Sequence, residues 1–315
     1  MESIAAVCIL VLIAIGAWFY YNYTSPSHGG TREAPAVKQL KTAGKLSTEL
    51  EHYLEGLDAR SAAALLAENG EFMAASLWKE IGAMLASKGR VGEFTGLLKN
   101  PKPEIRTQAA EVLGYTAVPG AAQALLETLG DKNEEVRLAA GAALVRLRDP
   151  STAVPLAQGL GNPGKLLPAR VAEVLLALEE NAVGPLLEEI KKAGQEGQCL
   201  ICEVLGQLGN AGAVPALTEL LSTSTFVKVR AGAAGALGDI PASGKEGVDA
   251  LLAALGDPAW EVRSQAAKAL GQSGNRDAVP SLEVVAAGDE EWTVRTMAQA
   301  ALERLLLKDD ESPAG

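Results

Sequence analysis

Apolar and small residues recur along most of this chain at a spacing that places them on one face of a helix. Seven segments share a frame in which such residues stand at positions i, i+4, i+7 and i+8. The frames begin at Ile105, Val136, Leu167, Gly197, Val229, Val262 and Val294. Their last leucines lie 30 to 33 residues apart, and a fixed period in that range predicts an all-α solenoid of stacked helices.

Each frame is expected to form the second helix of a repeat, with a first helix upstream of it. Val214, Leu217 and Leu221 show the apolar stripe of such a first helix. Gly-Asp or Gly-Asn then breaks the chain, and the aspartates are expected to cap the second helix. Leu-Gly near the end of several frames, as at Gly114 and Gly271, predicts a left-handed C-cap conformation.

Five of the seven frames carry an arginine directly after their first residue. The resulting pattern, Gly-Asp followed by Val-Arg-x-x-Ala-x-x-Ala-Leu-Gly, resembles the HEAT-like repeats of phycobilisome-lyase-type proteins over about residues 91–310. The resemblance implies antiparallel helix pairs that stack into a right-handed superhelix, with the second helices lining its concave face. It also implies a ladder of these arginines with loop acids, made of Arg106, Arg137, Arg230, Arg263, Arg295, Asp131, Asp257 and Asp289.

The physical interpretation of the arginines agrees with that ladder. An arginine repeated at one helical position lies above its neighbours in the stack, and a carboxylate between successive guanidinium groups would relieve their repulsion. A row of arginines that binds a ligand is the alternative. Repeats three and four depart from the pattern, with Pro168 and Gln198 where arginine is expected. This gap is either ordinary drift between repeats or the mark of changed curvature or a patch specific to a partner.

Two tryptophans hold equivalent places in the last two repeats. Trp260 and Trp292 each stand two residues before the first residue of a frame. Equivalent placement indicates either packing between repeats or a pair of aromatic anchors for a partner protein.

The N-terminal segment predicts a membrane anchor. Residues 4–21 carry no charged side chain, and aromatic residues gather at the end of this run, as they do at a membrane interface. A cleaved signal peptide is the alternative, but the basic start and the small-residue cleavage site that it requires are missing. Basic residues follow the run at Arg32, Lys38, Lys41 and Lys45, which predicts an N-terminus outside and a cytoplasmic domain.

These observations divide the chain into five parts. Residues 1–23 form the single transmembrane anchor, and 24–46, rich in Pro, Gly and Ser, a flexible linker. Residues 47–90 are expected to form capping helices, because solenoids cover their open ends with atypical units; Thr48 and Glu51 have the spacing of a capping box at the start of this region. The seven repeats occupy 91–310, and 311–315 form a disordered tail.

Motifs that resemble catalytic or phosphate-binding sites lack the context that such chemistry requires. Residues 159–165 match a phosphate-binding loop, yet no strand is expected before them. Cys199 and Cys202 form a Cys-x-x-Cys pair, interpreted as small apolar core residues, since no second pair or nearby histidine completes a metal site. Only two histidines, His28 and His52, are present. We therefore predict no catalytic, metal or cofactor site.

The sequence favours a protein-binding scaffold. A formal net charge of −11 argues against nucleic acid as the partner, because phosphate binding draws on clustered Lys and Arg. Solenoids present long concave faces to other proteins, so we expect a membrane-anchored, cytoplasmic adaptor that binds a protein partner on that face. The alternative, from the resemblance alone, is a lyase-like or regulatory subunit that acts on a chromophore-bearing or modified protein. The sequence leaves the oligomeric state open.

Overall fold

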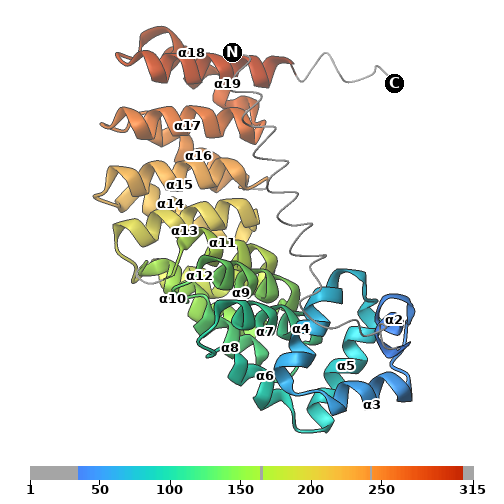
Figure 1. Cartoon of the computed structure of the whole chain (residues 1–315). Helices are drawn as coiled ribbons and strands as arrows, with labels where there is room; N and C mark the ends of the chain where they lie inside the picture. The colour runs from blue at the N-terminus through green and yellow to red at the C-terminus, as the bar shows by residue number, and fades with distance from the viewer. Residues whose placement is uncertain (1–34, 164–165, 242, 308–315) are drawn as a thin grey trace, which may run out of the picture.

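The chain forms a stack of helices in which each repeat contributes two. The computed structural model describes residues 35–163, 166–241 and 243–307, and within these ranges every regular element is helical. Figure 1 shows the helix pairs stacked in an arc, with α2 to α5 at one end and α18 and α19 at the other. The pairs are α6 (Val91–Leu97) with α7 (Pro103–Thr116), α8 (Ala121–Thr128) with α9 (Glu134–Leu147), α10 (Ala153–Gly161) with α11 (Pro168–Ala177), α12 (Glu180–Ile190) with α13 (Gln195–Leu208), α14 (Val214–Thr223) with α15 (Val227–Asp239), α16 (Gly244–Ala254) with α17 (Trp260–Ser273), and α18 (Val279–Gly288) with α19 (Trp292–Leu307).

The predicted frames form the buried faces of the second helices. Val136, Val229, Val262 and Val294 are fully buried, and so are most of the small residues that follow them in each frame. Leu167 differs, because α11 begins one residue later and Leu167 is its N-cap, 46% exposed. The frame that starts at Leu167 therefore lacks its first core residue.

The glycines near the ends of the second helices do not terminate them. Gly114, Gly238 and Gly271 lie inside α7, α15 and α17, contrary to the predicted left-handed caps. A Cβ at Gly114 would lie 2.5 Å from the Cβ of Ala143, and Gly271 approaches Ala301 in the same way. Their function is close packing of one second helix on the next. Successive second helices are accordingly in closer contact than successive first helices along most of the stack; at repeats three and four, α10 and α12 are in closer contact than α11 and α13.

The N-terminal cap is larger than expected. It comprises α2 (Pro35–Thr42), α3 (Thr48–Gly56), α4 (Ala59–Asn69), the 3-10 turn η1 (Gly70–Phe72) and α5 (Ala75–Ser87). Within the stretch expected to be a flexible linker, α2 buries Leu40 completely in the core, so its apolar face joins the cap. The cap of α3 is Ser47 rather than Thr48, because the Ser47 hydroxyl accepts the N–H of Leu50.

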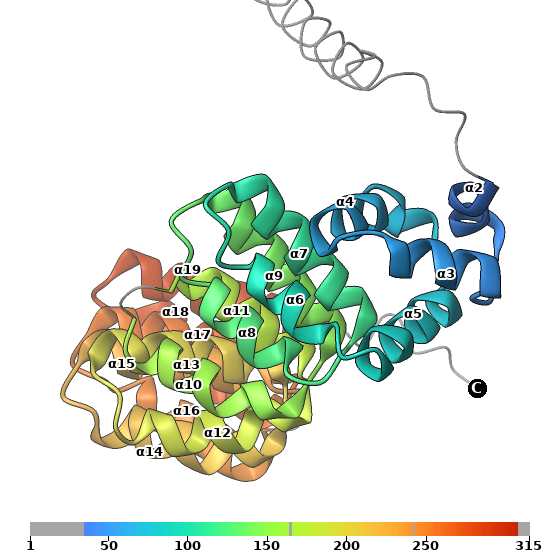
Figure 2. The ribbon, with the colours of Figure 1, turned by 60° about the horizontal axis from the view of Figure 1, so that its bottom comes forward.

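Aromatic stacking joins this cap to the first repeat. The rings of Trp78 in α5 and Tyr115 in α7 lie 4.7 Å apart and within 8° of parallel. Gly82 lets α5 approach the end of α7, since a Cβ there would lie 2.2 Å from the carbonyl oxygen of Thr116. Figure 2 shows α3, α4 and α5 beside the first repeats at this end of the stack.

The predicted membrane anchor lies outside the described residues, as does the predicted tail at 311–315. Among the helices that the structure describes, none is both long and apolar enough to cross a bilayer.

Candidate functional site

Three complete arginine–aspartate pairs connect neighbouring repeats. Each arginine leaves the first turn of a second helix and reaches the Gly-Asp turn of the next repeat. The Nε and Nη2 atoms of Arg106 donate to the two carboxylate oxygens of Asp131 at 2.8 and 2.7 Å. The same bidentate contact joins Arg230 to Asp257 at 2.8 and 2.9 Å, and Arg263 to Asp289 at 2.7 and 2.9 Å.

The remaining donor of each guanidinium fixes its orientation. Nη1 of every ladder arginine donates to a loop carbonyl six residues earlier in the chain, as Arg263 does to Asp257 at 3.0 Å. The carboxylate of Asp257 also accepts the N–H of Ala259, two residues on, and Asp131 and Asp289 make the same turn. The aspartates thus shape the loop before the second helix, and Asn133, not Asp131, is the N-cap of α9.

The pairs are largely withdrawn from solvent. The side chains of Arg263 and Asp289 are 9% and 8% exposed. Burial alone would raise the pKa of Asp131 and Asp257, but hydrogen bonds from Arg106 and Arg230 and from the loop backbone outweigh it and hold both values below 3.8. For Asp289 the hydrogen bond from Arg263 is the largest influence, and its pKa also lies below 3.8.

These lowered pKa values predict that stability depends on acidic pH. An aspartate with a lower pKa in the folded chain stabilises the fold above the unfolded value of about 3.9, and the contribution disappears as pH falls through the folded value. We expect the free energy of unfolding to fall steeply below about pH 4. Urea titrations at pH 5, 4 and 3 should show a flatter dependence for Asp289→Asn. Glu290→Gln is the control, since Glu290 is 84% exposed and 3.6 Å from Arg263; equal slopes for Asp289→Asn and the unaltered chain would contradict the prediction.

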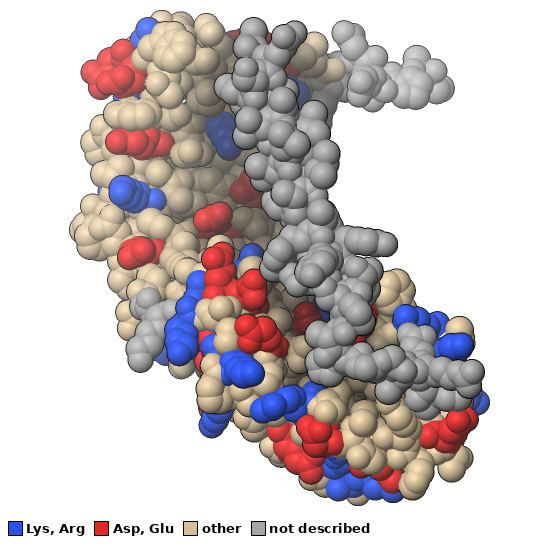
Figure 3. Space-filling view, in the orientation of Figure 1, with Lys and Arg blue, Asp and Glu red and all other residues tan. Residues whose placement is uncertain are grey.

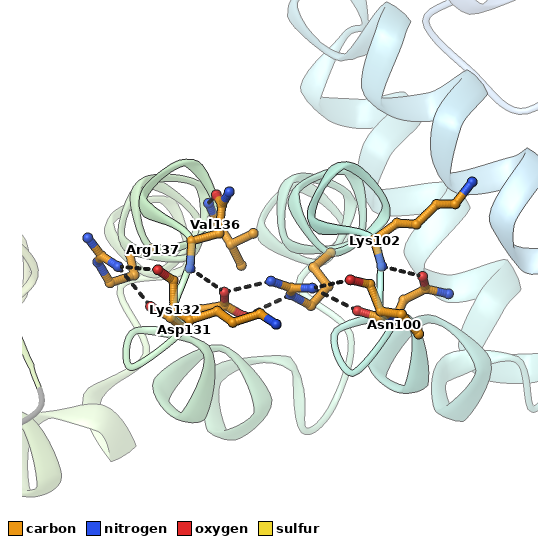
Figure 4. Close-up of polar contacts among 9 residues, drawn as sticks. Asn100, Lys102, Asp131, Lys132, Val136 and Arg137 are labelled. Atoms are coloured by element: carbon orange, nitrogen blue, oxygen red, sulfur yellow. Dashed lines mark hydrogen bonds and ion pairs between the residues drawn. The ribbon is translucent and has the colours of Figure 1, made fainter.

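Among the described residues, Arg137 and Arg295 have no carboxylate partner. Arg137 donates Nη1 to the carbonyl oxygens of Asp131 and Lys132, at 2.9 and 3.2 Å. Figure 4 shows it at the end of a chain of contacts that runs from Asn100 through Asp131. Arg295 makes the equivalent contacts with Asp289 and Glu290 in the last described repeat. The structure therefore pairs three of the five predicted arginines with the three predicted aspartates.

The departures at repeats three and four have local explanations. Pro168 is the first residue of α11, which begins at the position where the other repeats already have a full helical turn. Gln198 donates Nε2 to the carbonyl oxygen of Ile190, the last residue of α12, at 3.1 Å, and this contact stands in place of the arginine's contact with a loop carbonyl. Neither residue pairs with an acid, and the ladder is interrupted between Arg137 and Arg230.

Exposed aromatic side chains start three consecutive second helices. Trp260 and Trp292 are the first residues of α17 and α19, 40% and 69% exposed. Phe226, the N-cap of α15, is 46% exposed. We name these three side chains the aromatic edge. Phe226 was not expected from the sequence, because it stands four residues before its ladder arginine and the tryptophans stand three residues before theirs. An aromatic residue within four positions before a ladder arginine is the signal that identifies all three.

Acidic side chains lie beside the two tryptophans of this edge, whereas the exposed Lys228 lies two residues after Phe226. Glu261, Glu290 and Glu291 are exposed next to the tryptophans, beside the paired Asp257 and Asp289. Elsewhere on the face seen in Figure 3, basic side chains are interspersed with acidic ones. A hollow of about 690 Å³ lies between α14 and α16, with Leu221, Ala250 and Ala253 among its apolar lining and the paired Asp257 at its border.

The motifs that suggested enzymatic chemistry are placed as helix and core. The segment before the phosphate-loop match is helix α10 rather than a strand, so the context required for phosphate binding is absent there. Burial raises the pKa of the Cys202 thiol to about 12 and that of Cys199 as well, which disfavours the thiolate that nucleophilic or metal-binding chemistry needs. Within the described ranges no group of three or more His, Cys, Asp or Glu side chains could hold a metal ion.

The helix pairs, the inter-repeat ladder and the Gly-Ala contacts define a helical repeat protein. The family model for HEAT repeats matches residues 94–177 and 223–303, together more than half of the sequence, and the chain belongs to this family. A model for armadillo/beta-catenin-like repeats, a related arrangement of stacked helices, matches residues 202–240.

Solved structures resemble the chain only at low similarity. An engineered protein is 22% identical, with 82% of this chain and 77% of that chain covered and a TM-score of 0.38. Human deoxyhypusine hydroxylase is 22% identical and has a TM-score of 0.35; the match covers 76% of this chain and 94% of the hydroxylase chain. A chain in the complex of CpcE and CpcF of phycocyanin lyase from Nostoc sp. PCC7120 is 19% identical and has a TM-score of 0.30; the match covers 91% of this chain and 96% of that chain. These scores carry no argument about function, so the lyase-like alternative stays a prediction. No curated protein matches the chain.

Proposed function

We propose that the chain is a membrane-tethered, cytoplasm-facing scaffold whose HEAT repeats bind a partner protein along an extended face. The observation that carries the proposal is the aromatic edge. Trp260 and Trp292 are large, exposed and held at equivalent positions on stacked helices. Exposed tryptophans on a rigid surface are the side chains that most often anchor protein interfaces.

The packing of the second helices supports a concave binding face. Gly206 approaches Ala236, and Gly238 approaches Ala269, so closely that a Cβ on either glycine would lie within 3 Å of the next helix. Helices that approach each other most closely lie on the inner side of a curved stack. The aromatic edge stands at the starts of three of these second helices, which favours a partner that contacts this end of the concave face.

The predicted anchor at residues 4–21 would hold this surface at a membrane. The basic residues after it favour the cytoplasmic side, and tethering would raise the local concentration of a partner found at the same membrane. The acidic side chains beside the two tryptophans favour a partner whose contacting segment carries basic as well as apolar residues.

Removing the two tryptophans of the aromatic edge is expected to weaken the partner interaction strongly without unfolding the stack. A biotin ligase fused to the C-terminus of the full chain would label partners in the native cells. For Trp260→Ala combined with Trp292→Ala we expect partner labelling to fall by about ten-fold or more, because truncated tryptophan anchors cost about 2 kcal/mol or more each. The free energy of unfolding should stay within about 0.5 kcal/mol, as for surface substitutions.

The matched control is Val284→Ala, since Val284 is an apolar side chain on α18 that is 73% exposed. It should leave labelling unchanged. A chain without residues 1–23 should leave the membrane fraction and lose labelling of membrane-bound partners. Unchanged labelling in the double tryptophan variant contradicts the binding surface; unchanged membrane association of the truncated chain contradicts the tether.

A further inference from the structure

Arg137 is oriented for a partner that the described chain does not supply. Its Nη1 donates to the carbonyl oxygens six and five residues earlier, at 2.9 and 3.2 Å. Arg106 and Arg263 make the same two contacts, at 2.8 and 3.2 Å and at 3.0 and 3.3 Å. In both of those arginines the other edge of the guanidinium holds a carboxylate in a bidentate contact. Because the same Nη1 contacts hold Arg137, its Nε–Nη2 edge has the orientation that binds a carboxylate in Arg106 and Arg263.

This edge of Arg137 is unoccupied by any described residue. Its Nε is buried and has no hydrogen-bond partner, and no described side chain or carbonyl accepts from Nη2, so a bidentate contact with a second chain requires that Nε become accessible. The position that carries Asp131, Asp257 and Asp289 in the other repeats carries Asn162, whose side chain is exposed. A buried donor without a partner costs about 1 to 3 kcal/mol, so an acceptor that reached Nε would recover that cost.

The charges close to Arg137 leave room for an added carboxylate. The nearest ladder acid, Asp131, already accepts two hydrogen bonds from Arg106. Arg170 of α11 packs against Gly141, one helical turn after Arg137 on the same face of α9, and it is paired with Glu173 on its own helix. Lys132 is exposed on the adjoining turn. Glu134 and Glu135 are exposed in the first turn of α9, so the surroundings of Arg137 carry charges of both signs. Among the described residues near it, none forms an ion pair with the Nε–Nη2 edge of the Arg137 guanidinium.

We propose that Arg137 binds the carboxylate of an aspartate or glutamate side chain of the partner protein, which completes the interrupted ladder from outside. The proposal rests on the function proposed above and names the chemistry of one contact. A carboxylate is favoured over other acceptors because all three complete pairs hold one, and because its two oxygens match the planar fork of arginine. The interruption at Pro168 and Gln198 is then the place where the ladder admits a second chain.

The test is a titration of the purified full chain with the blocked peptide acetyl-Gly-Asp-Gly-amide, followed through the NMR resonance of the Arg137 Nε–H group. We expect this resonance to move and to saturate, with an affinity about ten-fold or more above that for the matched Gly-Asn-Gly peptide, as charge-assisted bonds require. Arg137→Gln, monitored on the backbone amides of α9, should lose the response. Arg137→Lys, which keeps a cation for the loop carbonyls but has no fork, should lose it as well and covers the case that the glutamine variant fails to fold.

Arg295→Gln is the matched control, since Arg295 has the same loop anchor in the last described repeat. It should change the response at Arg137 by less than about two-fold, because well-separated sites are additive. Equal responses to the Asp and Asn peptides, binding that persists in both Arg137 variants, or an equal response to sulfate at the same concentration would overturn the proposal. A negative titration together with loss of partner labelling in the tryptophan variant refutes only this contact and leaves the scaffold standing.

Discussion

Replacing Gly197 with alanine is expected to lower the free energy of unfolding by about 3 kcal/mol, the upper part of the range for overpacked cores. Gly197 lies in the first turn of α13, and a Cβ there would lie 2.0 Å from the carbonyl oxygen of Gly161 in α10. That oxygen belongs to the backbone of a helix, so neither side can yield without separating repeats three and four. Urea unfolding followed by circular dichroism would measure the loss.

Gly232→Ala is the matched control for this substitution. Gly232 lies within α15, and its added Cβ would meet nothing closer than the Cβ of Cys202 at 3.8 Å, an ordinary contact. Alanine there should raise the free energy of unfolding by about 0.5 to 1 kcal/mol, because glycine is a poor helix former. If Gly197→Ala were neutral or stabilising, the close approach of α13 to α10 would be wrong.

Gly197 also shows what the sequence could and could not predict about the fold. The apolar frame placed it correctly on the buried face of a second helix. The frame gives the period and the buried face, because both follow from helical geometry. It does not show why glycine is needed, because the close approach depends on the backbone of another repeat. The same limit explains Gly114 and Gly271, expected as helix ends and found as contact points between helices.

Local signals were weakest where the chain leaves the repeat pattern. The Pro- and Gly-rich composition of residues 24–46 indicated a linker, yet Leu40 is buried in the cap. A single apolar residue in a short helix is too little for a periodic signal. The sequence showed that Pro168 is an exception to the arginine pattern. It did not show that α11 begins at this proline and leaves Leu167 exposed.

The candidate site could be predicted in part. The resemblance to HEAT-like repeats implied a ladder of these arginines and aspartates, and the structure forms three such pairs. The resemblance could not show that Arg137 would keep its loop contacts without a carboxylate, because those contacts are made to backbone carbonyls that no side-chain pattern reveals. Trp260 and Trp292 are 40% and 69% exposed, so any packing between repeats leaves a large part of both side chains open to solvent.

Removing one partner of a buried pair should cost far more than removing one partner of an exposed pair. Arg263→Gln is expected to lower the free energy of unfolding by about 3 kcal/mol, because it leaves the carboxylate of Asp289 withdrawn from water without its cation. Arg148→Gln removes a contact with Glu179 at 2.9 Å that also joins two repeats, but those side chains are 59% and 68% exposed. The cost there should be below about 1 kcal/mol, as for exposed ion pairs.

A double-mutant cycle separates the pair from the rest of the ladder. Arg263→Gln combined with Asp289→Asn removes both charges, so the uncompensated carboxylate is gone and part of the stability should return. The two single losses would then exceed the loss of the double variant by about 1 kcal/mol or more. Equal costs for Arg263→Gln and Arg148→Gln, or additive losses in the cycle, would mean that the ladder does not hold adjacent repeats together. The stack would then depend on the Gly-Ala contacts and the apolar frames alone.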